Sequence, residues 1–435
     1  MIPDGSGREA EQPSGLGNPD AYLDSLEPIG WRLGLERMYR LTTALGLPQH
    51  RFASIHVVGT NGKSSVARMT AALLEAHGVG SGACLSPHTA SWAERTLIHG
   101  EQVGAGAWAS AVERVAAAAE SVNRSLDEGD AVTQFEAATA ATFVALASAR
   151  IEAAVIEAGL GGRLDATNTI PSRVTVLTSI GLDHTEWLGE TELEIAAEKL
   201  AVLRDQTTLV LGRVPPAVAD LAERTVAERG ARLLRAPEDP GPELRLRAPG
   251  GFQRRNFALA RTAAEAFLGE LEPALVERVA ATLPIPGRLE RIAEHPPTFI
   301  DAAHNPDGAA ALAEALPALS AGRRVVACLA ILADKDAPAM IKALAPALTH
   351  AITTQLPAAG PKSPAGGGMS AHRPSVPADA LAAMCREAGV GAEAEVDFAA
   401  ALGRARALAL EVPEGVLLIA GSNYGIAPAR AVLRA

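Results

Sequence analysis

Short apolar runs alternate with longer amphipathic stretches over most of the chain. Continuous apolar runs predict buried strands, and apolar positions three or four residues apart predict helices. In the first part of the chain, the predicted strands are residues 54–58, 81–85, 153–157, 174–178, 207–211 and 232–234. The predicted helices are residues 32–46, 63–77, 107–125, 135–149, 191–203, 215–229 and 254–268. Strands that alternate with helices favour an α/β fold with a doubly wound, mainly parallel sheet.

A second alternating series begins near residue 288 and predicts a smaller α/β domain. Its predicted strands are residues 298–301, 324–329, 349–353, 393–396 and 416–420. Its predicted helices are residues 307–318, 337–345, 378–388, 398–411 and 425–433. The Pro-rich run at 283–287 is the predicted hinge, and the Pro-, Gly- and Ser-rich stretch at 357–377 predicts a mobile surface loop. We therefore predict a disordered lead-in (1–18), a large first domain (19–286) and a smaller second domain (287–435).

The composition narrows the classes of partner. The chain has 435 residues and a formal net charge of -11, which argues against nucleic acid as the main partner. Cys84, Cys328 and Cys385 lack metal-ligand spacing, so we predict small buried side chains in a reducing compartment. Because no apolar run reaches the ~18 residues of a membrane span, we expect a cytoplasmic protein with no membrane partner.

A glycine-containing turn between a predicted strand and a predicted helix indicates a phosphate-binding loop. It comprises residues 59–65, Gly-Thr-Asn-Gly-Lys-Ser-Ser. Its glycines allow a tight turn whose N–H groups face phosphate oxygens, and Lys63 adds a positive charge. The helix that follows favours anions at its N-terminus. The alternative is an ordinary glycine turn before a helix with a surface lysine.

Polar side chains also follow other predicted strands of the first domain. Glu157 ends one strand and is suited to Mg²⁺, which prefers hard oxygen ligands. His184 and Ser86 follow two further strands and are candidates for the same metal site. The alternatives are a hydrogen-bonded loop histidine beside Asp183, a turn serine before a proline, and, for Lys199, a solvated helix lysine.

In the second domain, Asp301 and His304 follow the first predicted strand and face the cleft that the domains share. Arg288 lies at the hinge, and its planar fork is suited to polyphosphate. The alternative for this segment is a helix N-cap at Asn305 or Asp307.

Several motifs occur in a fixed order between about residues 30 and 430. They are GTNGKSS at 59–65, LSPH at 85–88, EAGLGGRLDATN at 157–168, TSIGLDHTEWLG at 178–189, EK at 198–199, FQRRN at 252–256, PGR at 286–288 and DAAHNP at 301–306. With these motifs the chain resembles the folylpolyglutamate synthase/dihydrofolate synthase family of the Mur ligase superfamily. The resemblance implies that the large sheet is of the P-loop type and that the second domain is a Mur ligase C-terminal-like domain.

The resemblance also implies a role for each matching residue. The implied contacts to ATP are Gly59, Thr60, Asn61, Gly62, Lys63, Ser64, Ser65, Asn256, Arg288 and Asp301. The implied ligands of Mg²⁺, with two ions expected, include Ser86, Glu157 and His184. The implied catalytic residues are Lys63, Lys199, which matches a lysine carbamylated in the family, and His304. The implied contacts to the pteroate substrate are Thr133, Gln134, Phe135, Glu136, Leu164, Asp165 and Ala166.

The family reaction is ATP-dependent formation of an amide through an acyl phosphate. We expect L-glutamate to be added to dihydropteroate, to the γ-carboxylate of a reduced folate, or to both, by a monomer. The first alternative is a related Mur-superfamily ligase that acts on a non-folate acid. The second is a nucleotide-binding module without catalysis.

Overall fold

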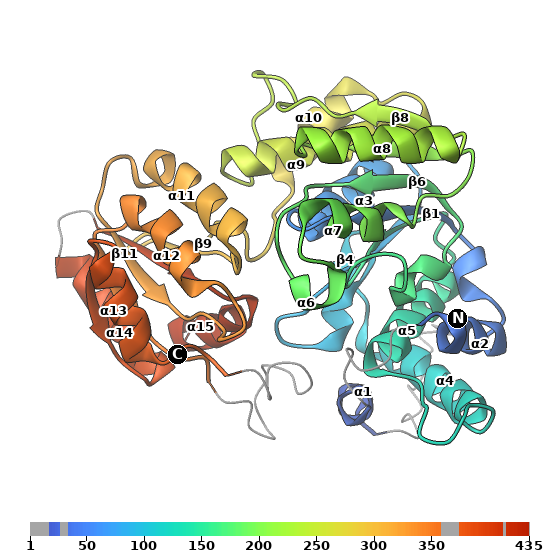
Figure 1. Cartoon of the computed structure of the whole chain (residues 1–435), viewed down its shortest axis with the longest axis horizontal. Helices are drawn as coiled ribbons and strands as arrows, with labels where there is room; N and C mark the ends of the chain where they lie inside the picture. The colour runs from blue at the N-terminus through green and yellow to red at the C-terminus, as the bar shows by residue number, and fades with distance from the viewer. Residues whose placement is uncertain (1–16, 27–33, 358–373, 412–414, 435) are drawn as a thin grey trace, which may run out of the picture.

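The computed structural model describes residues 17–26, 34–357, 374–411 and 415–434. Two lobes lie side by side, one blue to yellow and the other orange to red in Figure 1. Each lobe has its own mainly parallel sheet with helices on both faces, which confirms the predicted α/β class. The predicted lead-in lies outside the described residues except for Gly17 and Asn18, and the predicted loop at 357–377 does so except at its two ends.

The sheet of the first lobe is built from the predicted strands and an additional hairpin. Its strands are β1 (Ala53–Val58), β2 (Ser81–Cys84), β3 (Thr96–Ile98), β4 (Glu101–Gln102), β5 (Ala153–Glu157), β6 (Ser172–Leu177), β7 (Thr208–Leu211) and β8 (Arg232–Arg235). Among the described residues the order is β4-β3-β2-β5-β1-β6-β7-β8. All neighbours pair in parallel except β2 with β3 and β3 with β4. The carboxyl ends of β2, β5, β1 and β6 therefore lie along one edge, where ligands of such sheets gather.

Helices cover both faces of this sheet. They are α1 (Pro19–Ser25), α2 (Glu36–Ala44), α3 (Lys63–Ala76), α4 (Ala105–Asn123), α5 (Gln134–Ser148), α6 (Thr185–Leu188), α7 (Glu192–Leu200), α8 (Pro216–Glu228), α9 (Gly251–Leu268) and α10 (Pro273–Thr282). Because side chains alternate along a strand, Ala153 and Val155 of β5 pack against α3, α9 and α10. Ala154 and Ile156 pack on the opposite face against α4 and α5. Both faces of the central strands are thus buried, which explains their continuous apolar runs.

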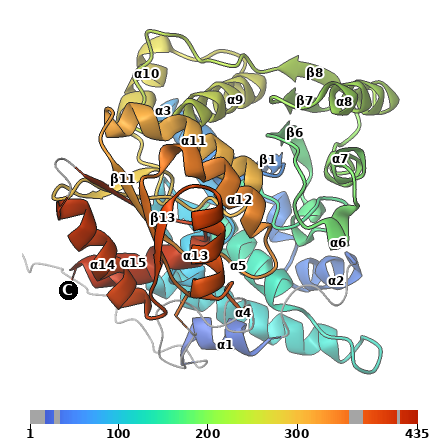
Figure 2. The ribbon, with the colours of Figure 1, turned by 60° about the vertical axis from the view of Figure 1, so that its left-hand side comes forward.

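The second lobe repeats this arrangement on a smaller scale (Figure 2). Its strands are β9 (Glu290–Ala293), β10 (Thr298–Ile300), β11 (Val325–Leu329), β12 (His350–Thr353), β13 (Gly391–Ala394) and β14 (Val416–Ala420). Its helices are α11 (Pro306–Ser320), α12 (Ala337–Leu344), α13 (Ala378–Glu387), α14 (Phe398–Glu411) and α15 (Ile426–Arg434). The described strands are ordered β13-β12-β11-β14-β10-β9, all parallel except β9. Helices α11, α12 and α13 pack on one face, and α14 and α15 pack on the other.

The prediction of secondary structure missed some edge elements. The hydrophobic pattern did not predict strands β3, β4 and β9 or helices α1, α6 and α10. The β3–β4 hairpin is only a few residues long and turns at His99 and Gly100, which both have positive φ. Such short pieces carry little periodic signal. The division of the chain into domains at residues 286 and 287 stays a prediction.

The three cysteines are free and buried, as predicted. Burial raises the pKa of the Cys84 and Cys328 thiols to about 12. Within the described part of the chain, no helix combines the length and apolar character needed to cross a bilayer.

Candidate active site

A cavity of about 1120 Å³ lies between the two lobes, along the carboxyl edge of the first sheet. Many of the predicted site residues, from widely separated segments, line it. Those that do are Gly59, Thr60, Asn61, Gly62, Lys63, Ser64, Ser65, Ser86, Phe135, Glu157, His184, Lys199, Asn256, Arg288, Asp301 and His304. The predicted residues that do not line it are Thr133, Gln134, Glu136, Leu164, Asp165 and Ala166.

The phosphate loop connects β1 to α3 and requires glycine at two positions. Gly59 has φ +146°, and a Cβ there would collide with the Thr178 hydroxyl. Gly62 has φ +85°, and a Cβ there would overlap the side-chain oxygen of Asn256. Helix α3 begins directly after Gly62, and no side chain of the described residues caps its N-terminus. The first-turn N–H groups therefore remain available to an anion.

Hydrogen bonds hold this loop against the segment after β6. The N–H of Thr60 donates to the Ser179 carbonyl (2.8 Å), and the N–H of Asn61 donates to Ser179 Oγ (3.0 Å). Lys63 Nζ donates to the carbonyls of Gly59 (3.1 Å) and Thr60 (3.0 Å). Since an ammonium has three donors, one N–H of Lys63 is left for a phosphate oxygen.

Glu157 is a buried carboxylate at the end of β5, with 2% of its surface exposed. It accepts hydrogen bonds from the Ser86 N–H (2.8 Å) and from Ser64 Oγ (2.8 Å), which are both uncharged. Burial raises the pKa of Glu157, and the nearby Lys63 charge opposes this effect. Within the described residues no ion pair reaches this carboxylate, so a divalent cation fits as its partner.

The donor set around Glu157 suits magnesium rather than a softer metal. Ser64 and Ser86 supply oxygens beside the carboxylate, and His184 lies on the same cavity wall. Burial lowers the pKa of His184 to about 4, so its ring is neutral at pH 7. In the part of the chain that the structure describes, no three His, Cys, Asp or Glu side chains form a metal-binding group. Magnesium tolerates such a sparse protein shell because it keeps several waters.

Lys199 lies on α7 with 4% of its surface exposed, so it is not a solvated helix lysine. Burial and the charge of Lys63 lower the pKa of its amine to about 7. The same helix packs closely on the glycine-rich turn, because a Cβ on Gly162 would overlap the Glu198 carbonyl. The lowered pKa favours the neutral amine of Lys199, which is the nucleophilic form.

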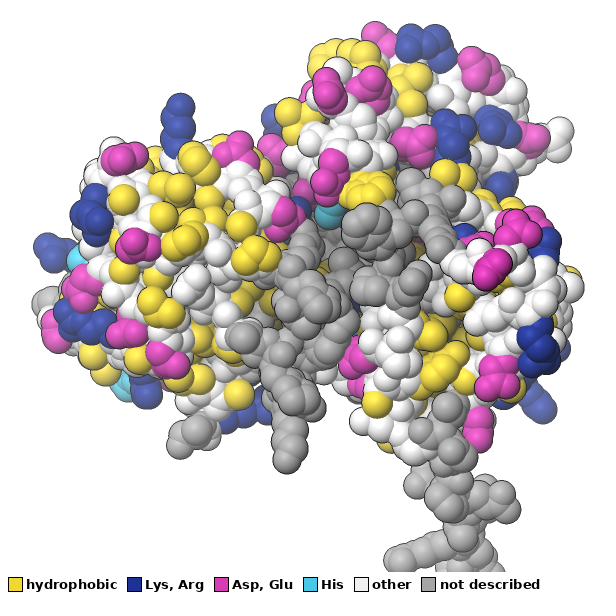
Figure 3. All heavy atoms as spheres, turned by 60° about the horizontal axis from the view of Figure 1, so that its bottom comes forward, with side chains coloured by type: hydrophobic (Ala, Val, Ile, Leu, Met, Phe, Trp, Pro, Cys, Tyr) yellow, Lys and Arg dark blue, Asp and Glu magenta, His cyan; other side chains and the backbone are white. Residues whose placement is uncertain are grey.

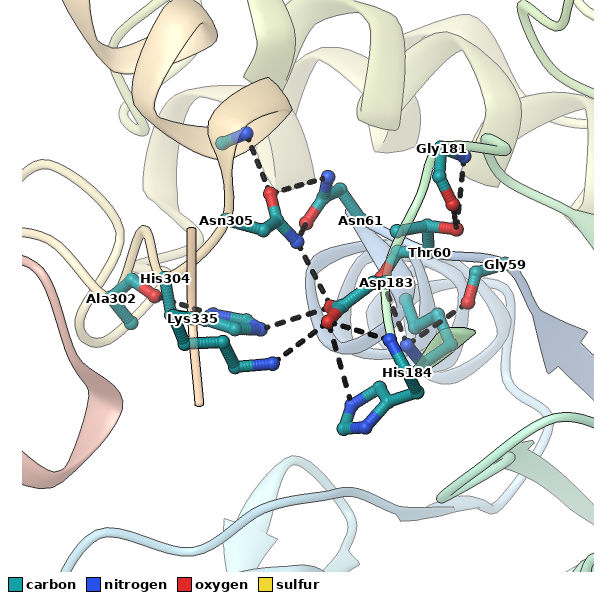
Figure 4. A network of polar contacts seen from close by, with 12 residues as sticks. Gly59, Thr60, Asn61, Gly181, Asp183, His184, Ala302, His304, Asn305 and Lys335 are labelled. Atoms are coloured by element: carbon teal, nitrogen blue, oxygen red, sulfur yellow. Dashed lines mark hydrogen bonds and ion pairs between the residues drawn. The ribbon is translucent and has the colours of Figure 1, made fainter. Parts of the chain in front are cut away.

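Asp183 is the centre of a polar network that joins the lobes (Figure 4). Lys335 Nζ donates to Asp183 Oδ1 (2.8 Å), and Asn305 Nδ2 donates to Oδ2 (3.1 Å). His304 Nε2 lies 3.7 Å from the same Oδ2. Burial opposes ionisation of Asp183, but its contact with His304 and the Lys335 ammonium together hold its pKa well below the usual range. The carboxylate is therefore ionised and binds three side chains of the second lobe.

A second contact between the lobes involves the phosphate loop itself. The side-chain amides of Asn61 and Asn305 exchange two hydrogen bonds, of 3.1 and 3.0 Å. Asn305 also accepts the N–H of Gly308 (2.8 Å), so it is the N-cap of α11 that its sequence position suggested. The position of α11 is thus linked directly to the loop at residues 59–65.

The predicted substrate segments have mainly structural contacts. Thr133 and Glu136 form a capping box at the start of α5, and Glu136 also pairs with Arg37 (3.1 Å). Gln134 Nε2 donates to the Leu23 carbonyl (3.1 Å). Phe135 alone of this segment lines the cavity, where its ring packs on Gly159.

The second predicted substrate segment follows the glycine-rich turn. Asp165 is buried and accepts the N–H groups of Leu160 (2.8 Å) and Thr167 (3.0 Å), which holds the turn in shape. Leu164 is 39% exposed, and Ala166 is buried. The roles of both segments toward pteroate stay predictions.

Sequence reasoning did not select Asp183, Lys335, Asn305 or Arg95 as site residues. Asp183 was read only as a neighbour of His184, and Asn305 only as a helix cap. The signal for Lys335 is its position between two aspartates, Asp334 and Asp336, just after an apolar strand. No local pattern identifies Arg95.

Comparison with known proteins agrees with this geometry. Residues 57–228 match the Mur ligase middle domain family, and residues 287–423 match the family described as Mur ligase, glutamate ligase domain. The chain is 35% identical over 358 residues to the dihydrofolate synthase/folylpolyglutamate synthase of Mycobacterium tuberculosis, covering 74% of each chain.

Solved structures of such enzymes share the whole fold. The folylpolyglutamate synthase of M. tuberculosis complexed with ADP has a TM-score of 0.85 and 30% identity, with 95% of this chain and 97% of that chain covered. An FPGS–AMPPCP–folate complex has a TM-score of 0.81 and 30% identity, with 96% and 99% covered. The chain belongs to the folylpolyglutamate synthase/dihydrofolate synthase family of Mur ligases.

Proposed function

We propose that this protein is an ATP-dependent ligase that adds L-glutamate to dihydropteroate, to the γ-carboxylate of folyl(poly)glutamate, or to both. One observation carries the proposal. The phosphate loop, the buried Glu157 carboxylate and the cationic side chains of the second lobe all line one cavity. A simple kinase would not need a second α/β lobe to present an amine, and a nucleotide binder without catalysis would not need Glu157 as a metal ligand.

The first step is phosphoryl transfer to the acceptor. A carboxylate oxygen of the acceptor forms a bond to the γ-phosphorus of ATP while the bond from this phosphorus to the β–γ bridging oxygen breaks, so ADP leaves and an acyl phosphate forms. The N–H groups of α3 and the free N–H of Lys63 stabilise the negative charge on the transferred group. Magnesium, when held by Glu157 with Ser64 or Ser86 and His184, supplies further charge stabilisation.

The second step forms the amide. The amine nitrogen of L-glutamate attacks the acyl carbon, a proton is lost, and the carbon–oxygen bond to phosphate breaks. The contacts of Asp183 and Asn61 with the second lobe keep this lobe close to the phosphate loop. Closure excludes water, so that the acyl phosphate reacts with the amine and not with hydroxide.

The test is a substrate panel with ADP release as the readout. Dihydropteroate and tetrahydrofolate are each offered with and without L-glutamate. We expect ADP release that requires both an acceptor and glutamate, and the active acceptor reports which of the two activities is present. Glutamate-dependent release only with non-folate acids would identify a different Mur-superfamily ligase. Nucleotide binding without any turnover would identify a non-catalytic module.

We further propose that Lys199 is carbamylated. Burial and the charge of Lys63 lower the pKa of this amine, which favours the neutral form that attacks CO₂. Removing bicarbonate and CO₂ should lower ADP release by about a hundredfold, the scale of a lost electrostatic contact, and adding bicarbonate should restore it. Lys199→Met should show low activity that bicarbonate does not change. Full wild-type activity after rigorous depletion would contradict the proposal.

The remaining expectations concern partners and location. We propose a cytoplasmic monomer with domains at 19–286 and 287–435 and no nucleic-acid partner. Acidic and basic side chains are interspersed on the face in Figure 3, in keeping with a net charge of -11 and unlike a continuous basic patch. The three buried free thiols suit a reducing compartment.

A further inference from the structure

Arg95 is a buried cation on the cavity wall without an acidic partner. It ends the short helix η2 (Trp92–Arg95) after β2, and 6% of its surface is exposed. Its Nε donates to His88 Nδ1 (3.0 Å). Among the described residues this is the only hydrogen bond of its side chain, and no carboxylate lies within ion-pair distance. The N–H groups on both terminal nitrogens therefore have no acceptor in the described part of the chain, although the residue lines the cavity.

Two aromatic rings fix the guanidinium in place. Its central carbon lies 4.4 Å from the ring centre of Trp92 and 5.8 Å from that of Phe135. Trp92 is itself held by a hydrogen bond to Asp24 (2.9 Å), and Phe135 packs on Gly159 of the glycine-rich turn. A cation oriented in this way presents a ready-made planar fork, which is suited to bidentate binding of a carboxylate.

The charges around Arg95 also favour the binding of an anion. Burial lowers the pKa of the Arg95 guanidinium. Cys84 and Tyr424, and after them Glu157 and Asp165, oppose this effect, but none of the four is hydrogen-bonded to the guanidinium. The neighbouring Glu94 carboxylate is occupied by the N–H groups of residues 89–91. The charges of Arg68 and Arg288 also interact with the Glu157 carboxylate. Several guanidiniums are thus near one carboxylate, which is also suited to magnesium.

Arg95 lies between the phosphate loop and the glycine-rich turn. On one side it is near Glu157, which accepts a hydrogen bond from Ser64 of the loop. On the other side it faces Phe135, which packs on Gly159 of the turn. Aromatic side chains next to a fixed cation suit a ligand that carries both a ring and a carboxylate. On the basis of the proposed function, we infer that Arg95 binds the carboxylate of the acceptor, the group that is phosphorylated, and thereby selects an acid over a neutral analogue.

The test compares two variants and two ligands. Arg95→Gln keeps hydrogen-bonding ability but removes the charge, and Arg95→Lys keeps the charge but removes the fork. We expect the KM for dihydropteroate to rise by about tenfold to a hundredfold in Arg95→Gln, the scale of a lost hydrogen bond to a charged group. Arg95→Lys should lie between this variant and the wild type. The KM for ATP should change by less than about twofold in both. Arg114→Gln, an exposed arginine of α4, is the matched control and should behave as wild type.

Equilibrium binding of the acid and of its methyl ester, followed by tryptophan fluorescence, identifies the group that Arg95 contacts. The wild type should prefer dihydropteroate to its methyl ester by a factor similar to the loss in Arg95→Gln, and Arg95→Gln should bind both alike. Thermal melting checks that the variants fold. If Arg95→Gln is unstable, two measurements still test whether Arg95 binds the carboxylate. They are the KM of Arg95→Lys for dihydropteroate and the preference of the wild type for the acid over its ester.

The outcomes separate this inference from the function on which it rests. If the wild type and Arg95→Gln use dihydropteroate equally well, only the inferred role of Arg95 is overturned. An equal loss for ATP and for the acceptor would make Arg95 a structural residue and also overturn the inference. A wild type that neither binds dihydropteroate nor turns it over would remove the proposed function together with the inference.

Discussion

Replacing Lys63 with alanine is expected to lower glutamate-dependent ADP release by at least about a hundredfold. The ammonium already donates to two carbonyls of its own loop, so it is fixed in position before the substrate arrives. Lys63 also lines the cavity in which, by the proposed mechanism, charge develops on the transferred phosphoryl group. Losing one preorganised contact of this kind costs on the order of 3 kcal/mol in the transition state.

The measurement is a steady-state assay of ADP release with saturating acceptor and glutamate. Lys342→Ala is the matched control, because Lys342 is an exposed lysine on α12 for which no functional role is predicted. A second measurement, the affinity for ADP, separates an effect on nucleotide binding from an effect on the chemical step. We expect the largest effect on kcat. Near-normal turnover of Lys63→Ala would show that this loop does not support phosphoryl transfer.

The glycine turn at residues 59–65 was predictable because its information is local. Gly59 and Gly62 lie between a strand and a helix, and both have the positive φ that the turn requires. That this turn and Lys63 bind phosphate stays a prediction. The central strands were predictable in the same way as the turn, because their apolar runs reflect burial on both faces. By contrast, the hairpin of β3 and β4 carries almost no periodicity, and its position at the sheet edge leaves few residues to form a pattern.

The network at Asp183 could not be predicted for a different reason. Asp183 and Lys335 are separated by 152 positions in the sequence, and only the packing of two lobes brings them within 2.8 Å. Asn305 shows how a correct local assignment can be incomplete. It does cap α11, yet its amide nitrogen also reaches Asn61 and Asp183.

The segment at residues 133–136 shows the opposite case. Its Thr-x-x-Glu pattern is that of a capping box, and the structure has this capping box. The resemblance to a family assigned substrate contacts to the same residues, but only Phe135 lines the cavity. The capping box therefore explains why Thr133 and Glu136 occur in this segment. The predicted contact of the segment with substrate depends on Phe135.

The second large effect is expected for Asp183→Ala, which removes the common acceptor of Lys335, His304 and Asn305. The Lys335 side chain is 8% exposed, so its ammonium would be left buried without a counter-charge. Breaking a buried pair from one side typically costs about 3–5 kcal/mol. We expect the contact between the lobes to weaken by a similar amount and ADP release to fall by at least about a hundredfold, because the lobes no longer close over the acyl phosphate.

A double-mutant cycle with Lys335→Met separates the loss of the contact from the cost of the stranded charge. Because methionine carries no charge, Asp183→Ala combined with Lys335→Met should melt at a higher temperature than Asp183→Ala alone, although its turnover should stay low. Asp220→Ala, at an exposed aspartate of α8, controls for the loss of a negative charge elsewhere on the first lobe. If the two substitutions are simply additive in melting temperature and Asp183→Ala keeps normal turnover, then the ion pair does not hold the lobes together. In that case the direct amide contact between Asn61 and Asn305 would have to hold the second lobe against the phosphate loop.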